Sequence, residues 1–259
     1  MMNNSNNYSR FKAVLLSFLL SVVAVQAAMS KPDFDFYATL GQKPENIKLE
    51  PGASFASNGL LHIGAGGRAL IPELSSWNIN EEGFTAVMTC KTDRPDLIGF
   101  FGKSKVFETR VGGFLWTDIF AEKDTLNRVG WNKKMPKDQY VQLAVTAQFI
   151  DDPPSGRNGY MFTAYLNGEL VTMVFFNHMK YCIGDGDFWL GNSRGGFELC
   201  GDIAEFKFYK RPLTAGEIYQ LTVGNEFIAE KSYEIPANEK KLLPRLPMTH
   251  RKWHGCGRH

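Results

Sequence analysis

The stretch GYMFTAYLNGELVTMVFF, residues 159–176, is the feature that most constrains the fold. Two runs rich in β-branched and aromatic residues flank Asn167-Gly168, and both of these turn residues tolerate positive φ. The pattern therefore predicts an antiparallel hairpin that is closed by a two-residue type I′ turn. This turn sets a register of three facing pairs: Leu166 with Glu169, Ala164 with Val171, and Phe162 with Met173.

Other short runs alternate between apolar and polar residues, which is the period of a strand. In Phe84–Thr92 every second residue is apolar, so the run predicts a half-buried strand with Cys90 as a small core residue. Tyr140–Ile150 is apolar on both faces, as expected for an inner strand. Leu97–Gly102 and Gly113–Phe120 look like further strands. Short strands with turn residues between them, and little helical periodicity, predict an all-β sandwich.

The runs on either side of Gly191-Asn192 predict a second hairpin, centred near Gly191. Cys182 and Cys200 would then lie equally far from the turn, and opposed cysteines on adjacent strands are close enough to bridge. We therefore predict a Cys182–Cys200 disulfide, which would contribute about 3 kcal/mol by restricting the unfolded chain. Two separate buried thiols are the alternative. The spacing of the four cysteines matches no zinc pattern.

The first 27 residues have the pattern of a secretory signal peptide. Arg10 and Lys12 precede the apolar run Ala13–Val25, which is shorter than the ~20 residues that span a bilayer. Small residues end the pattern, so we expect cleavage after Ala27; a buried core helix or an N-terminal anchor is the alternative. No later segment approaches membrane length. The chain is therefore predicted to be secreted or periplasmic, with no membrane span after removal of the signal.

Removal of this leader changes the charge balance. The full chain has 29 Lys and Arg residues and 27 Asp and Glu residues, and the leader holds two of the basic residues and none of the acidic ones. The remainder then has no formal net charge, which gives no electrostatic reason to bind nucleic acid. Residues 28–232 are predicted to form one domain. Residues 233–259, which are basic and contain proline, are predicted to be an extended C-terminal tail.

The segment CGDIAEFKFYKRPLTAGEI, residues 200–218, changes from a strand pattern to a helix pattern. Asp202–Lys210 is rich in Ile, Phe and Tyr, and Pro212 ends this predicted strand because proline cannot donate to the ladder. Thr214 and Glu217 then form a T-x-x-E capping box. The sequence therefore predicts a short C-terminal helix that starts directly after the strand.

This closing segment resembles that of laminin-G-like, concanavalin A-like jelly-roll domains. YVQLAVTAQF followed by AYLNGELV is similar to the central strand and hairpin of that family, with Tyr140 in place of a tryptophan. The chain departs from the family's pattern at Ala204, where the family usually has Asp. The matching residues of the closing segment are Gly201, Ile203, Glu205, Tyr209, Arg211, Leu213, Thr214, Glu217 and Ile218. The resemblance covers roughly residues 35–225. It implies an antiparallel two-sheet β-sandwich, the concanavalin A-like jelly roll, with one short C-terminal helix.

Catalysis is not expected from the sequence. Some relatives of this fold hydrolyse or eliminate polysaccharides, and the glucanases among them carry E-x-D-x-E, because residues two apart on a strand share a face. No such triplet occurs here. Asp185 and Asp187 have the right spacing, but Trp189 stands where a third carboxylate would be, and Gly184 and Gly186 suggest a turn. A polysaccharide hydrolase or lyase is therefore the less favoured alternative.

The favoured function is a secreted, non-catalytic module that binds carbohydrate or an extracellular protein. A glycan site needs exposed aromatic rings to stack on sugars and polar groups to bond their hydroxyls. The candidate ligand-binding residues are Trp116, Asp118 and Trp131, with Asn192 and Arg194 on a rim loop. An exposed Trp116 would favour sugar binding. A buried Trp116 would favour the alternative, a structural or adhesive surface domain without a small ligand.

The resemblance also leaves calcium open as a cofactor. Family members often hold Ca²⁺ at the rim of the sandwich, and oxygen ligands suit this hard ion. Asp185 and Asp187 in the short GDGD run could contribute, and so could Asp118. The alternative is that the two carboxylates of this turn are simply solvated.

Overall fold

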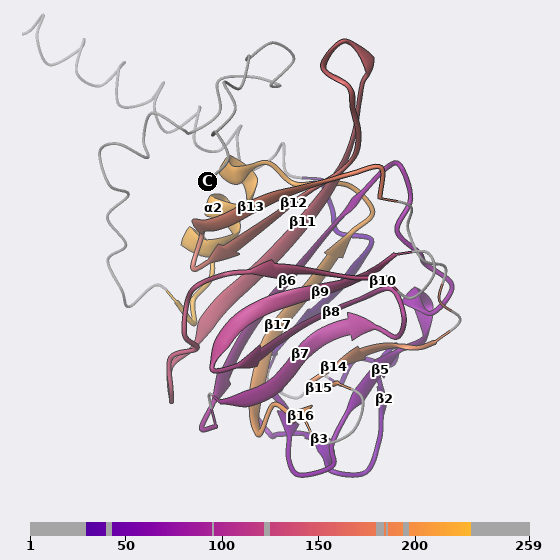
Figure 1. The fold of residues 1–259 in the computed structure, drawn as a ribbon. Helices are drawn as coiled ribbons and strands as arrows, with labels where there is room; N and C mark the ends of the chain where they lie inside the picture. Colours follow the sequence, from indigo (N-terminus) through magenta and orange to yellow (C-terminus); the bar gives the residue numbers. More distant parts are fainter. Residues whose placement is uncertain are drawn as a thin grey trace, which may run out of the picture. The chain divides into compact units, whose positions relative to one another are not determined.

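The structure is a computed structural model, and the chain divides into two compact units, Met1–Pro32 and Asp33–His259. The second unit is an all-β sandwich of two antiparallel sheets with one short α-helix near the end of the described chain (Figure 1). The described residues are 30–39, 43–94, 96–121, 125–179, 184, 186–193 and 197–228. Outside them lie the predicted signal peptide (1–27), the predicted tail (233–259), Cys182, Asp185 and Arg194.

The larger sheet has eight strands in the order β13-β12-β11-β6-β17-β4-β3, with β1 paired to β17 beside this path. Its strands are β1 Phe34–Tyr37, β3 Ala53–Phe55, β4 Leu61–Ile63, β6 Phe84–Thr92, β11 Val141–Asp152, β12 Arg157–Leu166, β13 Glu169–Asn177 and β17 Gly201–Tyr209. The predicted inner strand, β11, does lie inside the sheet, between β12 and β6.

The smaller sheet has seven strands in the order β10-β9-β8-β7-β14-β5-β2. Its strands are β2 Lys48–Leu49, β5 Ala69–Ile71, β7 Leu97–Lys103, β8 Phe107–Gly112, β9 Phe114–Ala121, β10 Thr125–Gly130 and β14 Phe188–Leu190. The remaining elements are the strand pair β15 Asn192–Ser193 and β16 Phe197–Glu198, the short 3₁₀ helices η1 Pro72–Leu74 and η3 Pro153–Ser155, and the helix α2 Ala215–Val223. No helix within the described ranges is long and apolar enough to cross a membrane.

The core between the sheets is rich in aromatic rings. Phe84 on β6 lies 4.8 Å from Phe107 of the smaller sheet and 5.1 Å from Trp77, measured between ring centroids. Such pairs stabilise a core beyond their burial alone. Cys90 is fully buried on the same strand, and this burial raises the pKa of its thiol, as expected for a core residue rather than a reactive one.

Strand β6 differs from the prediction in one respect. It was expected to be half-buried, but Val87 and Thr89 on its second face are buried too. The reason is that the chain after β17 folds back over this face: Thr85 Oγ1 donates to Arg211 O at 3.0 Å, and Asn225 Nδ2 donates to Thr89 Oγ1 at 2.7 Å. The period-two pattern could not show this cover, because it comes from residues more than 120 positions away.

The hairpin between β12 and β13 confirms the predicted turn. Asn167 and Gly168 have φ values of 50° and 77°, and Leu166 faces Glu169. A β-bulge then adds one residue, Val171, to β13. The two outer predicted pairs are therefore wrong. The observed pairs are Ala164 with Thr172 and Phe162 with Val174.

The predicted hairpin centred near Gly191 is wrong. Strand β14, on one side of this point, pairs with β5 and β7, because its three apolar residues complete the core of the smaller sheet. The pairing that follows joins Asn192 to Glu198, so its centre lies further along the chain. Cys200 is a free cysteine and Cys182 lies outside the described residues, so the predicted Cys182–Cys200 disulfide is not observed.

The change from strand to helix after Tyr209 is confirmed. Thr214 is the N-cap of α2: its Oγ1 accepts from Glu217 N at 3.2 Å, and its backbone N–H donates to Glu217 Oε2 at 2.8 Å. The helix packs its buried face on the larger sheet, where Thr222 Oγ1 donates to Gln142 Oε1 at 2.5 Å. The capping box was therefore specified locally, as predicted.

Candidate functional site

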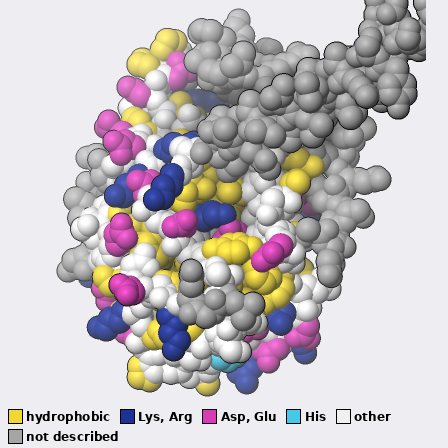
Figure 2. Space-filling model, turned by 180° about the vertical axis from the view of Figure 1, so that it is seen from behind, with side chains coloured by type: hydrophobic (Ala, Val, Ile, Leu, Met, Phe, Trp, Pro, Cys, Tyr) yellow, Lys and Arg dark blue, Asp and Glu magenta, His cyan; other side chains and the backbone are white. Residues whose placement is uncertain are grey.

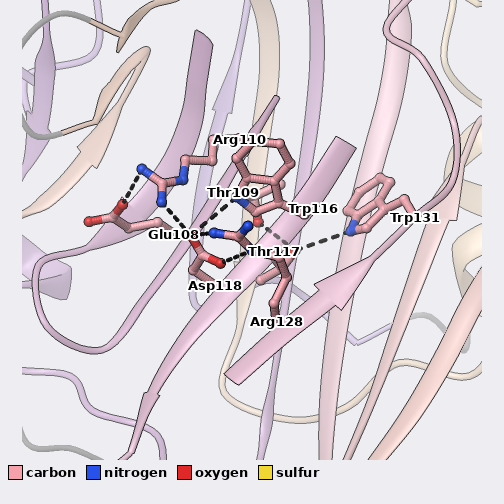
Figure 3. A network of polar contacts seen from close by, with 8 residues as sticks. All are labelled: Glu108, Thr109, Arg110, Trp116, Thr117, Asp118, Arg128 and Trp131. Atoms are coloured by element: carbon pink, nitrogen blue, oxygen red, sulfur yellow. Dashed lines mark hydrogen bonds and ion pairs between the residues drawn. The ribbon is translucent and has the colours of Figure 1, made fainter. Parts of the chain in front are cut away.

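Strands β8, β9 and β10 bring five polar and aromatic side chains together on the outer face of the smaller sheet (Figure 3). In the strand register Asp118 lies between Glu108 and Arg128, and Trp116 lies beside Arg110. Leu115 and Ile119, the alternate residues of β9, are buried in the core. Trp116 and Asp118 thus share the face that the strand pattern predicted for them. We name these residues the Asp118 cluster: Glu108, Arg110, Trp116, Asp118 and Arg128.

The Asp118 carboxylate is the centre of this cluster and is fully buried. Arg128 binds it through two bonds, from Nε to Oδ1 at 2.7 Å and from Nη2 to Oδ2 at 3.2 Å. Arg110 Nη2 and Trp116 Nε1, the latter at 3.1 Å, also donate to Oδ2. Charge-assisted, two-point bonds of this kind fix geometry as well as contributing energy. Asp118 therefore orients both the guanidinium of Arg128 and the indole of Trp116.

The indole of Trp116 lies beside two guanidinium groups. The Cζ atoms of Arg128 and Arg110 are 4.6 Å and 5.5 Å from its ring centroid, within the range of a cation–π interaction. Its outer edge lies over Gly112, where an added Cβ would come within 2.3 Å of an indole carbon. Trp116 is partly exposed and the Arg128 side chain is 49% exposed, so both present a fixed surface to solvent.

Apolar side chains extend this surface along the sheet. Phe114, two residues before Trp116 on β9, is 52% exposed, and Lys134 Nζ lies 5.8 Å from its ring centroid. Leu97 on β7 is 55% exposed and faces Gly112 in the register, which in turn faces Phe114. The face therefore combines exposed aromatic and apolar groups with cations, the composition that ligand-binding surfaces use.

Glu108 and Asp118 form a facing pair of carboxylates, which the sequence analysis missed. They are register partners on adjacent strands, and glycoside hydrolysis uses two such groups. Both side chains are fully buried, however, and Arg110 Nη1 lies 3.8 Å from Glu108 Oε2 while Arg110 Nη2 binds Asp118. A catalytic acid must reach the glycosidic oxygen, so this pair is not placed for hydrolysis. Phe107–Gly112 is not among the predicted strands, so the sequence offered no neighbouring strand on which Glu108 would face Asp118.

Of the four predicted binding residues that the structure describes, it brings together Trp116 and Asp118. Trp131 is buried in the core, where its Nε1 donates to Thr117 Oγ1 at 3.2 Å. Asn192 is also buried, on the short strand β15. Arg194 lies outside the described residues.

Asp118 does not fit the role of a calcium ligand, because both of its oxygens are occupied by hydrogen-bond donors from cationic or indole groups. Asp187 is exposed, and its Oδ1 accepts from Ser75 Oγ at 3.3 Å; Asp185 lies outside the described residues. Within the described part of the chain, no group of three or more His, Cys, Asp and Glu side chains could hold a metal ion.

A third buried carboxylate, Glu205, lies on the outer face of the larger sheet and is 2% exposed. Its Oε2 accepts from Asn225 Nδ2 at 2.6 Å and from Thr89 Oγ1 at 3.2 Å, and its Oε1 accepts from Lys207 Nζ. Asn225 belongs to the segment after α2, residues 225–228, which we name the strap. Glu205 therefore fastens the strap to the sheet.

Two tyrosines hold the rest of the strap. Tyr37 O–H donates to Glu226 Oε1 at 2.7 Å, and the ring centroids of Tyr140 and Phe227 are 5.1 Å apart. Seen from behind (Figure 2), the molecule shows hydrophobic side chains among both acidic and basic ones. On this side of the molecule, acidic and basic side chains are interspersed and do not form one basic patch.

Comparison with known proteins defines the class of fold. No protein-family model matches the chain, and no curated protein matches its sequence. One similar solved structure is the HCR/D W1238A mutant, with a TM-score of 0.54 and 10% identity over 73% of this chain and 51% of that chain. Another is the receptor binding domain of botulinum neurotoxin mosaic serotype C/D, with a TM-score of 0.50 and 10% identity over 69% of this chain and 46% of that chain.

A third similar structure is the CBM40 of Ruminococcus gnavus IT-sialidase bound to α2,3-sialyllactose, with a TM-score of 0.44 and 16% identity over 54% of this chain and 83% of that chain. The chain covers about half the length of the HCR/D and the botulinum neurotoxin chains above. At these identities the similarity shows the fold alone. The protein is therefore an all-β sandwich domain with a fold similar to part of the receptor binding domain of botulinum neurotoxin mosaic serotype C/D.

Proposed function

We propose that this chain is a secreted, non-catalytic module of the laminin-G-like kind that binds carbohydrate through the Asp118 cluster. The observation that supports the proposal is the state of Trp116. Its indole is partly exposed, and Asp118 and two guanidinium groups fix its orientation. A rigid aromatic ring with polar groups at its edge suits a sugar, which has an apolar face and a rim of hydroxyls.

Arg128 supplies the polar partner beside this ring. Its Nε and Nη2 bind Asp118, and its half-exposed side chain directs the remaining Nη1 away from that carboxylate. A guanidinium held in this way donates hydrogen bonds without first losing rotamer freedom. Sugar hydroxyls and carboxylates are both acceptors for such a donor. An extracellular protein is the alternative ligand, and it would use the exposed Phe114 and Leu97.

The buried state of Glu108 and Asp118 supports a binding role over a catalytic one. Both groups are engaged by Arg110, so neither offers the accessible acid or base that glycoside cleavage requires. The leader pattern of residues 1–27 supports export of the chain.

A glycan-array screen of the protein, with and without Trp116→Ala, tests this function. We expect binding to one class of polysaccharide and a loss of at least about tenfold in affinity in the variant, because removing a central aromatic anchor has effects of this size. Leu126→Ala is the matched control, since Leu126 is 47% exposed on the neighbouring strand β10 but is not part of the cluster. Its affinity should stay unchanged.

Three outcomes would contradict the proposal. Binding to no glycan at all would favour a structural or adhesive domain. Equal affinity of the Trp116→Ala variant would place the site elsewhere. Release of reducing ends or unsaturated products from a bound polysaccharide would show an enzyme.

A further inference from the structure

Strand β13 is an edge strand of the larger sheet, and its sequence lacks the features that usually protect such an edge, although β10 of the smaller sheet contacts it and Lys133 Nζ lies 3.8 Å from Glu169 Oε1 at its start. It runs for nine residues, Glu169–Asn177, and carries neither proline nor lysine. From Leu170 to Asn177 it has no charged residue at all. Strand β10, one of the two edge strands of the smaller sheet, is shorter, at six residues, and carries Arg128. Long, uncharged edges are templates for pairing with another chain.

The register shows which backbone groups of β13 point outward. His178 N donates to Asn158 O at 2.6 Å, which marks this position as a hydrogen-bonded pair with β12. Antiparallel pairs alternate, so Phe176 and Val174 also bond to β12, while Met173 and Phe175 direct their N–H and C=O groups away from it. Within the described residues, no strand pairs with that outer edge of β13.

The side chains on this edge are apolar as well. Met173 is 37% exposed, and Phe175, two residues further on, shares its face and is partly exposed. Arg157 of β12 lies over the Phe175 ring, with its Cζ 5.9 Å from the centroid. Beyond the bulge at Val171 the ladder is regular, so the stretch from Thr172 to Asn177 can accept a partner strand in register.

We propose that β13 pairs antiparallel with β13 of a second copy of this chain, about a two-fold axis at Val174. This register places Met173 opposite the partner's Phe175, and the outward backbone groups of both residues then form the ladder. The side chains of Met173 and Phe175 meet their counterparts across the axis in one apolar cluster. The two eight-stranded sheets join into one continuous sheet.

A second copy fits this edge because the strand complements itself. A two-fold axis at Val174 brings no like charges face to face, since no charged residue lies between Leu170 and Asn177. Two-fold dimers are also the commonest oligomers of soluble proteins. The pairing uses the larger sheet and no residue of the Asp118 cluster, so it stands independently of the proposed function.

The test uses two single variants, Met173→Lys and Phe175→Glu, and follows mass by light scattering and by sedimentation velocity. The unchanged protein is expected to be a dimer at micromolar concentration. Each variant alone should raise the dissociation constant by at least about tenfold, because it buries a charge against an apolar residue of the partner. Arg157 beside Phe175 should keep the carboxylate variant folded, which circular dichroism would check.

Mixing the two variants tests the register itself. In the mixed pair the introduced ammonium of one chain lies opposite the introduced carboxylate of the other, so a heterodimer should form from two monomeric proteins. Leu170→Lys is the control: Leu170 lies on the same strand and is 39% exposed, but it precedes the bulge and should leave the dimer intact. A monomeric wild-type protein, a dimer that survives both single variants, or a mixture that stays monomeric would each overturn the proposal.

Discussion

Each of the two sheets has a buried carboxylate on its outer face, but the surroundings of the two carboxylates differ. Glu205 on the larger sheet and Asp118 on the smaller sheet are 2% and 0% exposed. Glu205 is covered by the strap, and its partners Asn225, Thr89 and Lys207 are side chains of the chain packed around it. Asp118 instead binds side chains, Arg128 and Trp116, that remain partly open to solvent.

This difference distinguishes a structural contact, at Glu205, from a candidate ligand-binding site, at Asp118. Around Glu205 two of the three bonded side chains, Thr89 and Asn225, are buried and only Lys207 is partly exposed, so the cluster holds one part of the chain to another. Around Asp118 the bonds fix the Trp116 ring and the Arg128 guanidinium, and the outer sides of both groups still face solvent. Fixing these side chains costs conformational entropy, although both of them remain partly exposed. Order maintained at an exposed surface points to a ligand, whereas order beneath a strap points to stability.

The largest expected effect is on the Glu205 side of the comparison. Glu205→Gln should lower the free energy of unfolding by about 3 kcal/mol, because it leaves Lys207 unpaired and sets an amide against the Asn225 donor. Urea unfolding followed by fluorescence would measure this change. Asp202→Asn on the same strand is the control, since Asp202 pairs with the exposed His62 and should cost less than about 1 kcal/mol.

Glycan affinity of the folded Glu205→Gln protein should be unchanged. A loss of glycan affinity in this variant would contradict the comparison, because it would show that Glu205 and the strap contribute to glycan binding.

A smaller change in stability is expected for Asp118→Asn, with a larger change in function. The variant should lose about 2 kcal/mol of stability, since Arg110 and Arg128 lose their charged partner but Arg128 can turn into solvent. Glycan affinity should fall as far as it does in Trp116→Ala, because both the indole and the guanidinium lose their orientation. Calorimetric titration would measure the affinity, and a variant that binds normally would show that Asp118 is structural only.

The smallest expected effect concerns the pH dependence of the helix that precedes the strap. Burial tends to raise the pKa of Glu217, but hydrogen bonds from Arg211 and Thr214 outweigh it and hold the pKa below its ordinary value of 4.5. A folded-state pKa below the unfolded value gives stability that is present above pH 4.5 and is lost as the pH falls through the folded value. The amount is about 0.5 kcal/mol, because the Arg211–Glu217 pair is partly exposed.

Glu217→Gln should flatten this part of the pH profile. The measurement is the free energy of unfolding from neutral pH down to pH 3, roughly one unit and a half below the ordinary value. Parallel profiles for the two proteins would show that the carboxylate does not contribute in the way proposed.

Features that depend on neighbouring residues were predictable from the sequence. The Asn167-Gly168 turn follows from the φ values that these two residues tolerate, and the cap of α2 follows from Thr214 and Glu217 three positions apart. The strand at Phe84–Thr92 has the predicted bounds, because its period of two is strong over nine residues. These interactions span only a few residues, so the chain specifies them before any tertiary contact forms.

Pairings beyond a turn were less predictable. The bulge at Val171 shifts the register of β12 and β13, although the turn itself is as expected. Strand β14 joins β5 and β7, which are distant in sequence, instead of the residues that follow Gly191. Each of these choices depends on which strands compete for the same apolar residues, and a single run of sequence does not contain its competitors.

The sequence by itself determined that the chain forms short antiparallel strands with a capped C-terminal helix, since alternation, turn residues and the capping box act over a few positions. Only the tertiary structure decided which side chains of these strands are exposed and which of them lie next to one another. It placed Glu108, Asp118 and Arg128 in one row across three strands, buried Trp131, and left Trp116 partly exposed. The physical reason is that the register between strands, which sets the neighbours of every exposed side chain, is fixed by the packing of the whole core.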